Sequence, residues 1–128
     1  MIDEDGYRTG RGTECIALDG HECYSLAEKQ IDDWLFAKGI EHTVEPDYPV
    51  HPELNPNGLK RADWEVDGVF IEYWGLAGDR EYDRKSRIKR KLAKKLGIKL
   101  IEVYPGDLQN LSVKLGSLIR AEESGRQL

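Results

Sequence analysis

The chain has 128 residues, of which 39% are hydrophobic and 34% charged, with a formal net charge of −5. This length fits one domain with its own core, and the composition excludes a disordered chain. The net negative charge disfavours a protein that coats nucleic acid over its whole surface. The short apolar runs exclude a transmembrane helix, and the acidic start lacks a signal-peptide core. We therefore expect a cytoplasmic protein with no membrane partner.

The predicted organisation is a flexible N-terminal segment over 1–11, a single domain over 12–122 and a flexible tail over 123–128. The domain opens with a short hairpin over 13–24, which turns at Asp19-Gly20.

The two cysteines of the chain lie in this hairpin. A two-residue turn opposes Cys15 to Tyr24 and Ile16 to Cys23, so the cysteines are offset and we expect free thiols. Cys15, His21 and Cys23 do not supply the four well-spaced ligands of a structural zinc site, so zinc is disfavoured.

A helix is predicted from about Ser25 to Lys38, where Gly39 is placed to end it. Its first turn matches the S-x-x-E capping box, in which Glu28 reaches back to the Ser25 amide. A strand over 40–45 follows, and the proline-rich residues 47–60 are predicted to form a loop.

Asp67-Gly68 between two β-rich runs, 61–66 and 69–74, predicts a hairpin with a two-residue type I′ turn. Its register opposes Asp63 to Glu72 on one face, with Cβ atoms roughly 5 Å apart. Two like charges so placed repel, and a divalent cation with oxygen ligands removes that cost. The alternative is that both acids are solvated on an exposed face. The opposite face is apolar and predicted to be core: Ala62, Trp64, Val66, Val69, Ile71 and Tyr73.

The rest of the chain is predicted as a helix over 80–96, an apolar strand over 98–104 and a last helix over 107–122. Strands that alternate with helices favour a mixed α/β (α+β) domain, in which helices flank a central mixed sheet.

The helix over 80–96 carries a stripe at helical spacing, formed by Tyr82, Lys85, Lys89, Leu92 and Leu96. Lys85 and Lys89 therefore begin on the inward side, although the alternative is that both lie along apolar surface and end in solvent. Basic residues are concentrated in the same helix. This uneven distribution of charge is compatible with a polyanion that binds to one face of the protein. These basic residues are Arg84, Lys85, Arg87, Lys89, Arg90, Lys91, Lys94 and Lys95.

Taken in order, Glu28, Asp63 and Glu72-Tyr73-Trp74 resemble the PD-(D/E)XK nuclease superfamily. The resemblance spans about residues 15–110. More narrowly, residues 69–75, then Tyr82 and Lys89, then residues 97–101 resemble nuclease modules found alone or appended to helicases and mismatch-type endonucleases. Trp74 stands where the superfamily has its lysine. In the narrower group that lysine moves to the following helix, which points to Lys89, with Lys85 as the fallback.

The resemblance implies a restriction-endonuclease-like αβββαβ core behind the N-terminal hairpin and hydrolysis of DNA by a metal-activated water. It assigns Mg²⁺ or Mn²⁺ to Asp63, Glu72 and the Tyr73 carbonyl, with Glu28 reaching the metal or its waters. Lys89 would orient the attacking water. Contacts to the nucleic-acid backbone would come from Tyr82, Arg84, Lys85, Arg87 and Arg90.

Three alternatives remain beside a plain DNA endonuclease: a junction- or flap-cutting endonuclease, a non-catalytic nucleic-acid-binding module, and a structural or partner-binding domain. A homodimer is left open, because small nuclease domains often need one to cut two strands.

Overall fold

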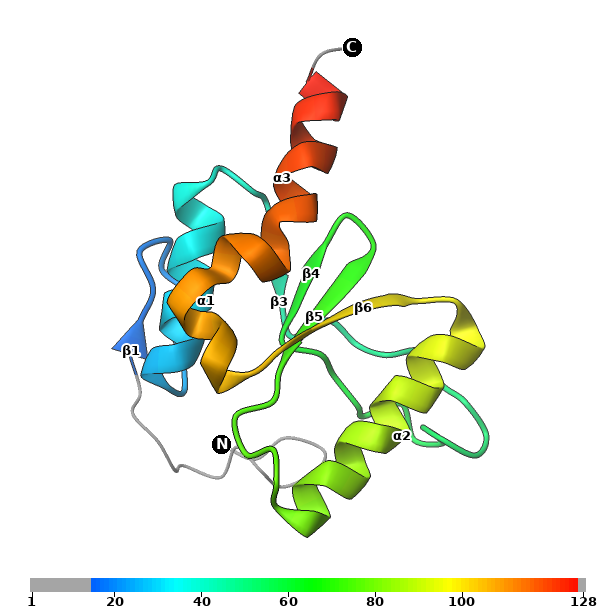
Figure 1. The fold of residues 1–128 in the computed structure, drawn as a ribbon. Helices are drawn as coiled ribbons and strands as arrows, with labels where there is room; N and C mark the ends of the chain where they lie inside the picture. The colour runs from blue at the N-terminus through cyan, green and yellow to red at the C-terminus, as the bar shows by residue number, and fades with distance from the viewer. Residues whose placement is uncertain (1–14, 127–128) are drawn as a thin grey trace.

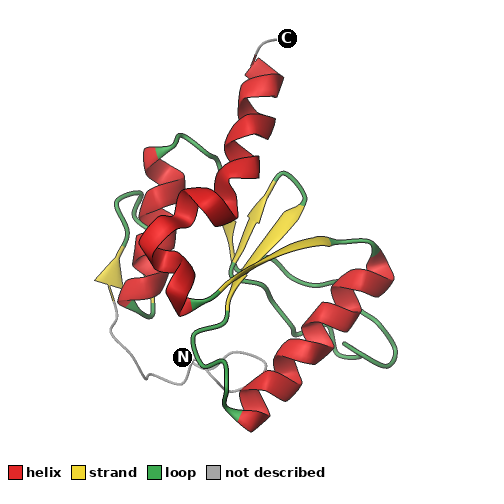
Figure 2. Ribbon diagram, in the orientation of Figure 1, coloured by secondary structure: helices red, strands yellow, loops and turns green. Residues whose placement is uncertain are grey.

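The computed structural model describes residues 15–126, in which helices cover both faces of a four-stranded sheet (Figures 1 and 2). The helices are α1 (Leu26–Ala37), α2 (Arg80–Leu96) and α3 (Leu111–Arg126), with a 3₁₀ helix, η1 (Pro105–Asn110), before α3. Helices α1 and α3 lie on one side of the sheet and α2 on the other.

The sheet is mixed, as predicted. Its strands, in spatial order, are β3 (Thr43–Val44), β4 (Trp64–Val66), β5 (Val69–Tyr73) and β6 (Lys99–Val103). Only β5 and β6 pair in parallel, because α2 carries the chain from the end of β5 back to the start of β6. The element order from α1 to β6 is α-β-β-β-α-β, and the α+β class is confirmed.

The central hairpin has the predicted turn, since Asp67 and Gly68 both adopt positive φ, 49° and 84°. Trp64 opposes Ile71 as predicted, but β4 begins at Trp64, so Asp63 and Glu72 do not form the expected ladder pair. Instead, a carboxylate oxygen of Asp63 accepts the Tyr73 N–H at 2.7 Å. The side chain thus takes the place of a strand carbonyl, while the Asp63 N–H still bonds to the Ile71 carbonyl at 3.2 Å.

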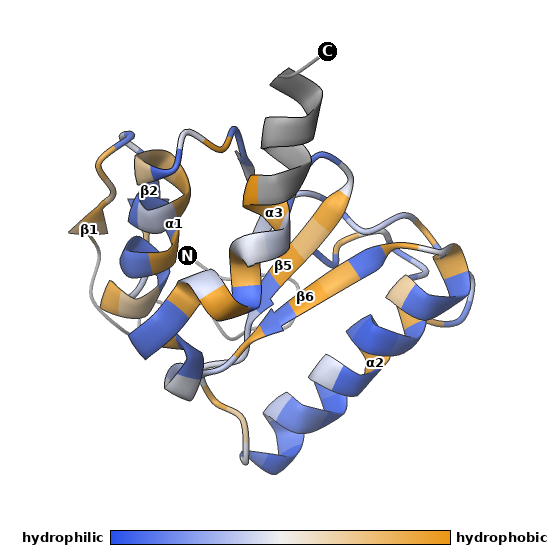
Figure 3. Cartoon of the chain, turned by 45° about the horizontal axis from the view of Figure 1, so that its top comes forward, coloured by the Kyte–Doolittle hydropathy of each residue, from blue (hydrophilic) through white to orange (hydrophobic). Residues whose placement is uncertain are grey.

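Each face of the sheet has its own core. Figure 3 shows that β5 and β6 are largely hydrophobic, whereas α2 is largely hydrophilic. The α1–α3 side contains Trp64 and Ile71, which are fully or almost fully buried. The α2 side contains Phe70 and Leu92. Ala62, predicted on the Trp64 face, packs with Phe70 instead, because the chain turns at Asp63 and the Ala62 N–H bonds to the Pro46 carbonyl at 3.0 Å.

The N-terminal hairpin is present as β1 (Cys15–Ile16) and β2 (Glu22–Cys23), but its predicted register is wrong. Cys15 lies directly opposite Cys23, because the loop has three residues rather than two. The Ala17 N–H bonds to the His21 carbonyl at 2.8 Å across that loop. Both thiols are free, as expected.

The last helix extends further than predicted, to Arg126, and begins later because η1 precedes it. The predicted flexible segment 1–11 lies outside the described residues, as do 127–128 of the predicted tail, whereas residues 123–126 of that tail belong to α3. Within residues 15–126, no helix has both the length and the apolar character needed to cross a membrane.

Candidate functional site

Glu72, near the end of β5, is only 2% exposed and lies beneath α2. The Tyr48 hydroxyl donates to its Oε2 at 2.8 Å, and the Lys89 ammonium lies 3.4 Å from the same atom. Burial raises the pKa of Glu72 to about 8, and the Asp63 charge adds to this, although Lys89 and Tyr48 act in the opposite direction. Nearby protein groups therefore leave the carboxylate short of positive charge.

Lys89 is 8% exposed, so it lies on the inward side of α2 as predicted. Its ammonium also donates to the Arg61 carbonyl at 2.8 Å, which places it between Glu72 and the chain that leads to Asp63. Lys85 lies one turn earlier and is half-buried. The predicted stripe ends early, since Leu96 is 40% exposed and Ile98 packs against the α2-side core after the Gly97 cap.

The Tyr73 backbone joins the two acids. Its N–H bonds to Asp63, and its carbonyl, the predicted metal ligand, accepts the Tyr82 hydroxyl at 3.1 Å. Burial raises the pKa of Tyr82, and the charges of Asp63 and Glu72 raise it further, so this hydroxyl stays protonated as a donor. The predicted role of Tyr82 at nucleic acid stays a prediction.

Glu28 occupies the first turn of α1 and takes part in its cap. The Ser25 hydroxyl oxygen accepts the Glu28 N–H at 3.0 Å. The Glu28 carboxylate accepts the N–H of Tyr24 at 3.4 Å, one residue before the amide predicted. Burial raises the pKa of Tyr73 and the Glu28 charge contributes, so this carboxylate acts on the end of β5. Its metal role remains a prediction.

The basic residues of α2 differ in their surroundings. Arg87 is exposed, and Arg84 is exposed with an ion pair to Glu81 at 2.8 Å. Arg90 instead turns inward, where it bonds to Glu102 and lies 5.4 Å from the centre of the Trp74 ring. Its predicted contact with nucleic acid stays untested, but its guanidinium already has an internal role.

Trp74 is buried beside Arg90, and its indole N–H donates to Glu102 at 2.7 Å. The side chain at the position where the resemblance leads one to expect a lysine therefore packs within the protein. The amine that lies beside Glu72 comes instead from Lys89 on α2.

Sequence reasoning missed Tyr48, because the proline-rich segment 47–60 was predicted only as a loop. That loop is held by Asn55, which is fully buried and donates to the carbonyls of Tyr48 and Pro49 at 3.2 and 2.9 Å. A tyrosine between prolines carries no periodicity that marks it as buried.

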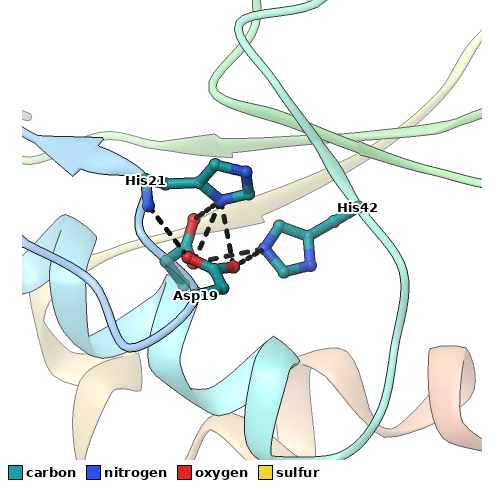
Figure 4. A group of neighbouring side chains, drawn as sticks. Asp19, His21 and His42 are labelled. Atoms are coloured by element: carbon teal, nitrogen blue, oxygen red, sulfur yellow. Dashed lines mark hydrogen bonds and ion pairs between the residues drawn. The ribbon is translucent and has the colours of Figure 1, made fainter.

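A second polar cluster, also missed, lies on the α1 side of the sheet (Figure 4). It brings together Asp19, His21, Asp32 and His42, with one potential ligand atom from each within 4.8 Å of the others. Of Cys15, His21 and Cys23, which the sequence disfavoured as a zinc site, only His21 belongs to this cluster. The sequence signal that could have revealed this cluster is Asp32, an acid that lies with Ile31 and Leu35 on the buried side of α1.

No protein-family model, no curated protein and no solved structure matches this chain.

Proposed function

We propose that this protein is a Mg²⁺- or Mn²⁺-dependent DNA endonuclease of the PD-(D/E)XK type. The observation that carries the proposal is a buried carboxylate, Glu72, beside a buried lysine, Lys89, at the strand end that Asp63 also reaches. The α-β-β-β-α-β order and the position of α2 over Glu72 are what a restriction-endonuclease-like core would have.

The donor set fits a hard divalent cation. Asp63, Glu72 and the Tyr73 carbonyl offer only oxygen atoms, which Mg²⁺ and Mn²⁺ prefer. The raised pKa of Glu72 fits as well, because a cation would supply the missing positive charge. When bound, such an ion supplies a nucleophilic water and polarises a phosphate oxygen.

The other residues of the site would orient the attacking water, support the metal and bind the DNA. Lys89, fixed by the Arg61 carbonyl, would position the attacking water and offset charge that develops on the phosphate. Glu28 would reach the metal or its waters. Arg84, Lys85 and Arg87 would contact the DNA backbone.

A non-catalytic nucleic-acid-binding module is the second candidate. Its support is that Glu72 already has two protein partners, Tyr48 and Lys89, as a structural ion pair would. In that case the basic residues of α2 would bind DNA without a metal.

The test is cleavage of supercoiled, linear, single-stranded and branched DNA, with Mg²⁺, with Mn²⁺ and with a chelator. We expect metal-dependent cleavage, and a preference for branched DNA would identify a structure-specific enzyme. Asp63→Asn and Glu72→Gln should each lower the rate by at least about 100-fold with an unchanged circular dichroism spectrum. The matched control is Glu65→Gln, an acid on β4 of the same hairpin.

Wild-type metal-dependent activity in either acid variant would refute the metal site. DNA binding that needs no metal, with no cleavage of any substrate, would favour the binding module.

A further inference from the structure

The second cluster joins three separate parts of the chain. Asp19 and His21 come from the N-terminal hairpin, Asp32 from α1, and His42 from the segment between α1 and β3. Figure 4 shows the labelled Asp19 carboxylate and the two imidazoles pointing toward one another.

The spacing of these atoms suits a tetrahedral metal ion. His42 Nε2 lies 2.9 Å from an Asp19 oxygen and 3.2 Å from an Asp32 oxygen. His21 Nδ1 lies 3.0 and 3.1 Å from oxygens of the same two residues. Ligands about 2.0–2.1 Å from a tetrahedral zinc ion are about 3.3 Å apart, so only small shifts are needed.

Neighbouring groups orient the ligands as in known metal centres. His42 Nδ1 lies 2.8 Å from the Ile40 carbonyl, which can only accept, so Nδ1 carries a proton. In the neutral ring, Nε2 then directs its lone pair at the two carboxylates. The Trp64 indole N–H donates to Asp32 at 3.0 Å and fixes that carboxylate. Such outer partners are typical of metal-binding His and Asp residues.

An unsatisfied oxygen points to a missing cation. Asp19 Oδ2 is buried and has no hydrogen bond of acceptable geometry within the described residues, although it lies 3.0 and 2.9 Å from His21 and His42 nitrogens. Asp32 is fully buried and the side chains of His42 and Asp19 are 4% and 11% exposed, so water reaches the cluster mainly beside His21, which is 32% exposed. Two carboxylates with two neutral imidazoles would be neutralised by one divalent ion.

We propose that Asp19, His21, Asp32 and His42 form a structural zinc site that fastens the N-terminal hairpin to α1 and the sheet. Four protein ligands with no open position are typical of a structural rather than a catalytic zinc. The site is separate from Glu72, which lies on the α2 side of the sheet. The competing arrangement has no metal, and protonated imidazoles neutralise the carboxylates.

The experiment uses the whole chain, stripped with a chelator and titrated with Zn²⁺ alone. We expect one zinc ion per chain by elemental analysis, saturable binding by calorimetry and a rise in melting temperature. His42→Gln and Asp19→Asn should each weaken Zn²⁺ binding by more than the roughly 10- to 100-fold that loss of an outer partner costs. His51→Gln, which changes the remaining histidine of the chain, is the matched control and should bind zinc normally.

Two further variants separate this site from its neighbours. A Cys15→Ser/Cys23→Ser double variant should keep zinc, since the thiols are not ligands. Glu72→Gln should also keep zinc even where DNA cleavage is lost, so the two proposals can fail independently.

The zinc site is refuted if the stripped protein binds no Zn²⁺, if binding survives in Asp19→Asn, or if it disappears in the cysteine double variant. Should His42→Gln fail to fold, Asp19→Asn, which changes a partly exposed hairpin loop, still decides the question.

Discussion

Glu72 and Asp32 are both buried carboxylates, on opposite sides of one sheet, yet their surroundings shift their pKa in opposite directions. Burial, with help from Asp63, raises the pKa of Glu72 above the ordinary value despite Lys89. Burial also opposes ionisation of Asp32, but hydrogen bonds that include those from His42 and Trp64 outweigh it and lower its pKa. Two carboxylates that are almost inaccessible to solvent thus have pKa values shifted in opposite directions.

The difference separates two kinds of site. Around Asp32, the Trp64 indole N–H and, when no metal is bound, a protonated His42 donate to the carboxylate, and zinc would take over the role of the His42 proton. Around Glu72 the protein supplies too few such donors, and a buried carboxyl whose pKa is strongly raised is characteristic of functional sites. This contrast supports the proposal of a reactive site on the α2 side and a structural site on the α1 side.

The largest expected effect is that of Lys89→Met. Loss of one preorganised charge should lower the cleavage rate at saturating DNA by about 100-fold or more, while DNA binding is largely retained. Single-turnover cleavage and a binding titration would measure the two effects.

Lys85→Met is the matched control on the same helix. It should weaken binding and reduce the salt dependence by about one counterion, with the rate at saturation maintained. The reverse pattern would move the catalytic role to Lys85, and full activity in the double variant would remove lysine from the reaction.

The next effect concerns stability. Without metal, Asp32→Asn should lower the free energy of unfolding by about 2–3 kcal/mol, because it removes the charge that pairs with a protonated His42 and accepts the Trp64 indole N–H. Glu72→Gln should leave the stability unchanged or raise it, since it removes a poorly compensated charge. Urea denaturation in chelator would measure both, and equal losses in the two variants would contradict the contrast drawn between the sites.

A smaller effect should appear in the pH dependence of stability. Since the folded-state pKa of Glu72 is raised from 4.5 to about 8, the folded chain binds its proton more tightly than the unfolded chain. That contribution is fully present below pH 4.5 and is lost as the pH rises through 8. Without metal, the wild type should therefore lose stability relative to Glu72→Gln over this range. Parallel pH profiles would show instead that Lys89, Tyr48 and Asp63 together leave Glu72 unshifted.

The sequence predicted most of the fold because its signals were local. Asp67-Gly68 determined the central turn, and the helical stripe placed Lys89 inward, beside Glu72. The register of the central hairpin predicted Asp63 and Glu72 as partners, although the strand pairing expected between them is replaced by a side-chain bond to Tyr73.

Residues that depend on long-range packing were missed. Tyr48 reaches Glu72 across 24 positions, and Asp32 meets Trp64 across 32 positions. Nothing in the spacing of His21 and His42 connects them, because a three-residue hairpin loop and the end of α1 bring them together. Because that loop is one residue longer than predicted, the register of the whole hairpin differs from the prediction.

The smallest effects should separate the two roles of the first turn of α1. Ser25→Ala removes the side-chain acceptor of the Glu28 N–H and should cost about 1 kcal/mol of stability. Glu28→Gln should leave the melting temperature unchanged, because glutamine also serves at that position of a capping box. If Glu28 only caps the helix, cleavage by Glu28→Gln should equal that of the wild type. We expect a clear loss of metal-dependent cleavage, since the Glu28 charge already acts on Tyr73 at the end of β5. Measured together, melting and cleavage distinguish a residue that supports the helix from one that also serves the metal.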